Sequence, residues 1–185
     1  HYWAYGGYLN LVRDGGEEPL STHADHYVTN RAYGTGAYSK GEVLMNQLAA
    51  VIGREARDAG ILRYFDEWSF KHPGPVDFKR VMERESGLEL DTYFQYMLHS
   101  THHVDVAIRS VVVTADSTTL TLERVGRLPL PVDVRITSAT GEVTDHHIPQ
   151  VVTQGHRTLS EGESLHDAWP WTNPTYTLTL PRSLP

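Results

Sequence analysis

Apolar residues in the first hundred positions recur at intervals of three and four, the spacing that gathers side chains on one face of a helix. Such stripes occupy residues 5–12, 43–52, 56–68, 78–82 and 90–97. Glycines follow three of the stripes, at positions 15, 53 and 87, as expected at helix ends. The pattern therefore predicts a series of helices that runs to about residue 100.

After Val104 the period of the apolar residues becomes two, which is typical of strands with one buried face. The alternation covers residues 111–113, 119–125, 132–136, 143–148 and 176–180. Short strands separated by turns at these intervals predict an antiparallel β-sandwich. We therefore expect an α+β protein of two domains, a helical domain at residues 1–103 and a β-sandwich at residues 104–185.

Composition narrows the class of partner. With 39% hydrophobic and 21% charged residues, the chain has the composition of a folded globular protein. A net charge of −7 argues against a nucleic-acid backbone or an anionic membrane as partner, since both require clustered Lys and Arg. No apolar run approaches the roughly 20 residues of a membrane-spanning helix. Because cysteine is absent, disulfides and thiolate sites are excluded.

Histidine is unusually frequent: the chain has eleven, and several lie close together at 23–26, 99–103 and 146–147. A native zinc site needs three or four converging ligands, and no H-E-x-x-H motif occurs. We therefore interpret the histidines as surface or locally hydrogen-bonded groups and expect no metal ligand in this chain.

Other catalytic motifs are also missing. The chain contains no G-x-S-x-G nucleophile elbow and no G-x-x-x-x-G-K-[ST] phosphate loop. The aromatic segment at 167–177, DAWPWTNPTYT, has two interpretations: a platform on which a sugar stacks, or a loop whose rings pack onto the core.

Three ordered stretches carry a resemblance to a known family. These are EEPLSTHADHY at 17–27, TNRAYGTGAYSKGEVLMNQLAAVIG at 29–53 and HPGPVDFKRVMERESGLELDTYF at 72–94. Together they resemble the end of the catalytic domain of M1 family zinc aminopeptidases. The family pattern Y-x-K-G-A is matched by Tyr38, Lys40 and Gly41, with Glu42 departing at the last position. The later stretches TLERVG, PVDVRIT and WPWTNPTYT resemble the β-sandwich domain that follows it.

The resemblance implies a thermolysin-like catalytic domain followed by the β-sandwich. In that family a tyrosine hydroxyl donates a hydrogen bond to the oxygen that becomes an oxyanion, and Tyr38 occupies the matching position. We expect Gly36, with Gly34, to let the approach to Tyr38 bend. Lys40 is expected to orient groups locally, and Gly41 to permit close helix packing.

The resemblance also implies zinc ligands on an H-E-x-x-H helix and the next helix, a general-base glutamate and a glutamate that binds the substrate's amine. We expect all of them to precede His1. The chain is thus expected to be the C-terminal fragment of a metallo-aminopeptidase that removes N-terminal residues from peptide substrates. Zinc would belong to the full-length parent, and the fragment alone would bind none and be inactive. The alternatives are a non-catalytic carbohydrate- or protein-binding module of helices plus a sandwich, and a purely structural pair of domains.

Overall fold

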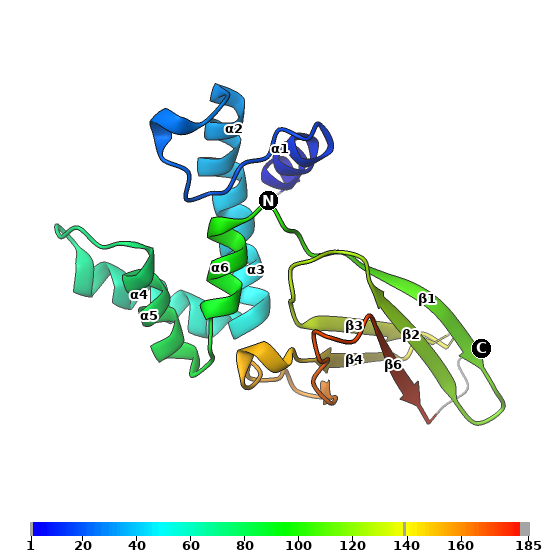
Figure 1. The fold of residues 1–185 in the computed structure, drawn as a ribbon. Coiled ribbons are helices and arrows are strands. Elements are labelled where there is room, and N and C mark those ends of the chain that lie inside the picture. Colours follow the sequence, from blue (N-terminus) through cyan, green and yellow to red (C-terminus); the bar gives the residue numbers. More distant parts are fainter. Residues whose placement is uncertain (1, 139, 182–185) are drawn as a thin grey trace. The chain divides into compact units, whose positions relative to one another are not determined.

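The computed structural model describes residues 2–138 and 140–181. They form two compact units, which divide between His102 and His103, beside the boundary predicted after residue 103. The first unit is helical and the second is built of β-strands, so the fold is mixed α and β (Figure 1).

Each of the predicted helical stripes lies in a helix of the first unit. The helices are α1 (Tyr2–Arg13), α2 (Asn30–Gly34), α3 (Gly41–Ile52), α4 (Arg54–Trp68), α5 (Pro75–Ser86) and α6 (Asp91–His99). Two glycines end helices as expected: Gly53 follows α3 with a φ of 89°, and Gly87 follows α5 in the left-handed region with a φ of 69°. Among the described residues, no helix is long and apolar enough to cross a bilayer.

The predicted buried faces are confirmed for α3 and α6, hold in part for α1, and are wrong for α4. All of the predicted α3 positions are buried, namely Val43, Leu44, Leu48, Val51 and Ile52. On α1 the buried residues are Ala4, Tyr8 and Leu11, while Leu9 is exposed. On α4 the predicted stripe of Ile61, Leu62 and Phe65 is exposed. Helix α4 instead buries Gly60, where an added Cβ would lie 2.5 Å from Met82 Sδ of α5.

The second unit contains two three-stranded sheets. One has the order β1 (Val106–Val113), β2 (Thr118–Arg124), β6 (Thr175–Leu180), and the other β3 (Val132–Thr137), β4 (Val143–Ile148), β5 (Ser164–Leu165). All neighbours are antiparallel except β4 and β5, which are parallel, so the prediction of purely antiparallel pairing is wrong for that pair. The alternation predicted at 111–113 is also wrong, because all three valines are exposed on the edge strand β1.

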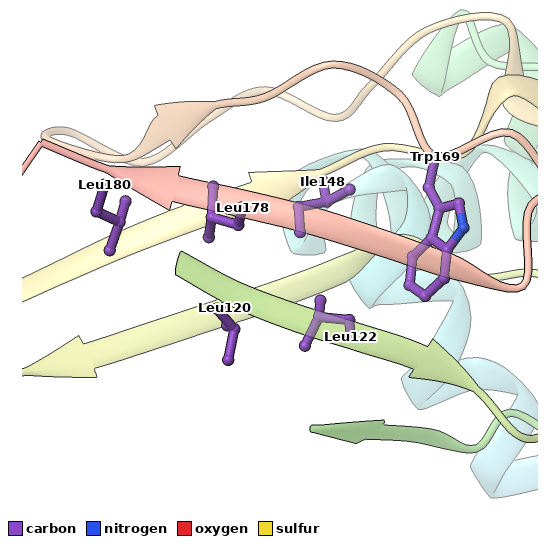
Figure 2. Close-up of a cluster of buried hydrophobic side chains, with 6 residues drawn as sticks. All are labelled: Leu120, Leu122, Ile148, Trp169, Leu178 and Leu180. Atoms are coloured by element: carbon purple, nitrogen blue, oxygen red, sulfur yellow. The ribbon is translucent and has the colours of Figure 1, made fainter. Parts of the chain in front are cut away.

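One hydrophobic cluster receives side chains from both sheets (Figure 2). Its fully buried members are Leu120, Leu122, Ile148, Trp169, Leu178 and Leu180. Leu120 and Leu178 are direct cross-strand partners on β2 and β6, and Ile148 reaches the cluster from β4. Partly buried valines and isoleucine of β3 pack against the same cluster. The two sheets therefore share one core.

Candidate functional site

The Tyr38 motif lies inside a continuous helical run. Residues 35–40 form a π-helical segment, the π turn (Thr35–Lys40), which joins the end of α2 to the start of α3. The amide of Gly41 donates to the carbonyl of Gly36, five residues earlier. Gly34 has ordinary helical angles, with φ −64° and ψ −46°. The expectation that Gly34 and Gly36 bend a loop-like approach is therefore wrong, because the approach is itself helical.

Tyr38 is exposed in this turn, as is Ala37 beside it. The Tyr38 side chain is 80% exposed, whereas Gly36 and Lys40 on either side are buried. A π-helical turn has a wider ring of backbone hydrogen bonds than an α-turn and occurs mostly as single turns, frequently at functional sites. The turn thus leaves the phenol accessible to solvent, while the residues two positions before and after it, Gly36 and Lys40, are buried.

Gly36 allows a close approach by another part of the chain. An added Cβ would lie 3.4 Å from the hydroxyl oxygen of Tyr27. That hydroxyl lies 3.1 Å from the carbonyl oxygen of Pro19 and 3.3 Å from that of Leu20. It therefore forms hydrogen bonds within the loop at 19–27. Gly36 therefore serves contact with the loop at 19–27 rather than bending.

Lys40 is almost completely buried and has two polar partners from distant segments. Its Nζ lies 2.8 Å from Oε1 of Glu17 and 3.1 Å from the carbonyl oxygen of Ser100. The hydroxyl of Tyr8 donates to the same Oε1 of Glu17 at 3.1 Å. Burial, and then the neighbouring Glu17 charge, raise the pKa of Tyr8 well above its usual value. The hydrogen bonds of Lys40 therefore run to distant segments of the chain and not, as predicted, to local groups.

Gly41 does not have the role that was predicted for it. An added Cβ there would meet no atom within 4 Å, so the residue does not face a packed helix. The close helix approach occurs instead at Gly7 of α1, where a Cβ would lie 3.2 Å from Oγ of Ser39 in the π turn. The residue that permits this packing therefore lies on the neighbouring helix, outside the motif.

The histidines divide into two kinds. His23 and His26 are exposed on the 3₁₀ turn Ala24–His26, in agreement with a surface role. His146 and His147 of β4 are buried and hydrogen-bonded, so the second of the two interpretations applies to them and the surface one does not. His147 Nδ1 lies 2.6 Å from Oδ1 of Asp133, its cross-strand partner on β3. Sequence reasoning missed this pair because their pairing depends on the register of two strands.

Asp133, His147 and Glu163 have ligand atoms within 4.8 Å of one another and form a candidate metal group. However, Nη2 of Arg157 lies 3.1 Å from Asp133 Oδ1 and 2.5 Å from Glu163 Oε1, so a guanidinium bridges the two carboxylates. Burial alone would raise the pKa of Asp133, but the hydrogen bond with His147 and the charge of Arg157 outweigh it and lower the pKa. This group fits a salt-bridge network better than an ion.

The second acidic group, at Glu83, Glu89 and Asp91, holds a lysine as well. Lys79 pairs with both Glu83 and Asp91. Across residues 2–138 and 140–181, neither group of three His or carboxylate side chains includes a residue of the π turn. Each group already contains a positively charged side chain, Arg157 in the first and Lys79 in the second.

The aromatic segment near the end of the chain packs onto its own unit. Trp169 is 2% exposed, and its Nε1 donates to the carbonyl oxygen of Asn173 at 3.0 Å. The guanidinium of Arg124 lies 4.0 Å from the ring centre of Trp171. Tyr176 donates to the carbonyl oxygen of Asp167 at 2.9 Å. These contacts favour the packed-loop interpretation and remove the support for a sugar-stacking platform.

Compared with models of known protein families and with curated protein sequences, the chain matches none. Functional inference therefore rests on the Tyr38 motif and on the geometry around it.

Proposed function

We propose that the chain is the C-terminal part of a zinc-dependent aminopeptidase of the M1 type, with Tyr38 as the hydrogen-bond donor to the oxyanion. The helical unit would be the end of a thermolysin-like catalytic domain, and the two sheets with their shared core would be the β-sandwich that follows. The observation that carries the proposal is the exposure of Tyr38, 80%, on a π turn that also contains the buried residues Gly36 and Lys40.

A phenol suits this role chemically. It is neutral at pH 7 and carries one O–H donor at the end of a rigid ring. Hydrolysis of a peptide bond develops negative charge on the carbonyl oxygen, and a donor that is held in place beforehand stabilises that charge without reorganisation. Tyr38 would donate its hydrogen bond to this oxygen more strongly in the transition state than to the neutral carbonyl of the bound peptide.

The zinc of such an enzyme would polarise the scissile carbonyl and activate the attacking water. Following the resemblance of the sequence, we propose that the zinc ligands belong to another segment of the parent enzyme. The chain by itself would then contribute Tyr38 and its supporting contacts but neither the metal nor the general base.

The test compares the full-length parent with the present chain on peptides of defined sequence, read by mass spectrometry. The parent is expected to release N-terminal residues one at a time from peptides with a free amine and to leave N-acetylated peptides intact. The chain alone is expected to release nothing and to show only weak Zn²⁺ binding in calorimetry. A parent that cleaves acetylated peptides at internal bonds, or cleaves no peptide, contradicts the proposal.

A further inference from the structure

Glu17 and Lys40 form a buried ion pair two residues from Tyr38. Their side chains are 7% and 1% exposed, and Nζ and Oε1 lie 2.8 Å apart. Buried charges are tolerated when they are paired and their remaining hydrogen-bonding capacity is used. Here the carbonyl oxygen of Ser100 accepts from Lys40, and the hydroxyl of Tyr8 donates to Glu17. The pair is therefore built into the structure rather than a chance surface contact.

The pair joins segments that are far apart in the sequence. Tyr8 lies on α1, Glu17 in the loop that follows it, Lys40 at the end of the π turn, and Ser100 just after α6. All four groups meet where the π turn becomes α3. The last residue of the turn thus bonds to two distant segments, and α1 supports one of these partners through Tyr8.

The geometry of the turn explains why such an anchor matters. A π turn includes one residue more than the α-turn it replaces, and it is the rarer form. Reverting to α-helical hydrogen bonds would rotate Tyr38 about the helix axis, relative to α3, by about 100°, the rotation per residue of an α-helix. Anchoring Lys40 opposes that change of register.

We propose that the Glu17–Lys40 pair is the positioning device of Tyr38: it holds the π turn in register and so aims the phenol in a single direction. The part of this inference that concerns catalysis rests on the proposed function of Tyr38. Lys40 and Glu17 are positioning residues, because they act through Tyr38 and touch no reacting atom. Buried ion pairs are best attested as determinants of register, which is the property invoked here.

The first experiment measures hydrogen exchange of the Gly41 amide, which donates across the π turn to Gly36. Lys40→Met is expected to speed this exchange by roughly 10-fold or more while α4 is unchanged, because only the local opening energy falls. The control is Lys79→Met, which removes another partly buried lysine with two carboxylate partners, on α5. If Lys40→Met does not fold, Glu17→Gln/Lys40→Met removes both charges and keeps an acceptor for Tyr8. Unchanged exchange at Gly41 in the folded variant overturns the proposal.

The second experiment uses the full-length parent and measures kcat and KM for Lys40→Met, Tyr38→Phe and the double variant. Lys40→Met is expected to lower kcat by about 10- to 100-fold with little change in KM, the effect of a misplaced catalytic group. In the Tyr38→Phe background, the same substitution should lower kcat by less than about 2-fold, because residues that act as a unit are not additive.

The outcomes separate the two proposals. If Lys40→Met lowers kcat by the same factor in both backgrounds, Lys40 does not act through Tyr38 and the positioning role is overturned. If Tyr38→Phe alone keeps its kcat, the proposed function fails, while the exchange of Gly41 still decides whether the pair holds the turn.

Discussion

The ammonium group of Lys40 lies 2.8 Å from a carboxylate oxygen of Glu17, in a place where neither side chain reaches solvent. Two residues earlier, Tyr38 is 80% exposed. One short turn therefore contains both a buried, paired charge and an exposed phenol. We therefore expect substitutions of Lys40 to lower stability, and substitutions of Tyr38 to lower activity without lowering stability.

Tyr38→Phe in the full-length parent should lower kcat by about 10² to 10³, the usual effect of losing one oxyanion donor. KM should change little, and the melting temperature should stay the same because the side chain is exposed. Steady-state kinetics and thermal melting measure these quantities. The control is Tyr33→Phe, on the same helical run, which should leave kcat near wild type. A Tyr38→Phe enzyme that keeps more than about a third of wild-type kcat contradicts the catalytic role.

Lys40→Met should lower the free energy of unfolding by about 3–5 kcal/mol, since it leaves the Glu17 carboxylate buried without its partner. Glu17→Gln/Lys40→Met should recover much of that loss, because both charges are gone. Urea denaturation gives both values. As a control, Arg31→Met removes an exposed ion pair with Asp14 and should cost less than about 1 kcal/mol. Equal losses for the Lys40 and Arg31 variants would show that burial of the pair contributes nothing.

The β unit should lose stability as the pH falls below about 6.5. His146 Nδ1 lies 2.9 Å from His166 Nε2, and burial, followed by the charge of His166, lowers the pKa of His146; burial also lowers that of His166. Well above pH 6.5 these side chains are neutral in both the folded and the unfolded chain, so they do not change the free energy of unfolding. Below it the unfolded chain binds protons more readily than the folded one, and the free energy of unfolding decreases.

Melting curves between pH 8 and pH 5 test this window, which lies above the range where the carboxylates titrate. The pKa values of Asp133 and Glu163 are lowered in the folded state, so their stabilisation is lost only at more acidic pH. His166→Gln should make the melting temperature depend less on pH over this range. His23→Gln, at an exposed position, should leave that dependence unchanged. Identical slopes in the two variants would rule out the buried pair as the cause.

Gly126→Ala should destabilise the β unit by at least about 1–3 kcal/mol, the cost of overpacking. An added Cβ would lie 2.4 Å from both the amide nitrogen of Asp105 and the carbonyl oxygen of His103, and backbone atoms do not move aside easily. Gly41→Ala is the matched control, because open space surrounds that position. It should be neutral or stabilise α3 by up to about 1 kcal/mol, since alanine is the better helix former. Thermal unfolding distinguishes the two, and a stable Gly126→Ala protein would contradict the close contact.

The sequence by itself determined the order and type of most elements. The apolar residues of α3 repeat every three or four positions and those of β2 every two, and these periods are properties of single segments. The helix ends at Gly53 and Gly87 could also be predicted from the sequence, because a positive φ is a local requirement that glycine meets. The Tyr38 motif was visible for the same reason, as a run of adjacent residues.

Tertiary structure alone decided which faces are buried and what surrounds the motif. The stripe on α4 is apolar but exposed, because Gly60, with no side chain, is the residue that meets α5. Burial of His147 follows from the register of β3 and β4, which no single strand specifies. The partners of Lys40 are Glu17 and Ser100, and only the folded chain brings them together. Periodicity records the conformation of a segment, whereas these contacts depend on how separate segments pack.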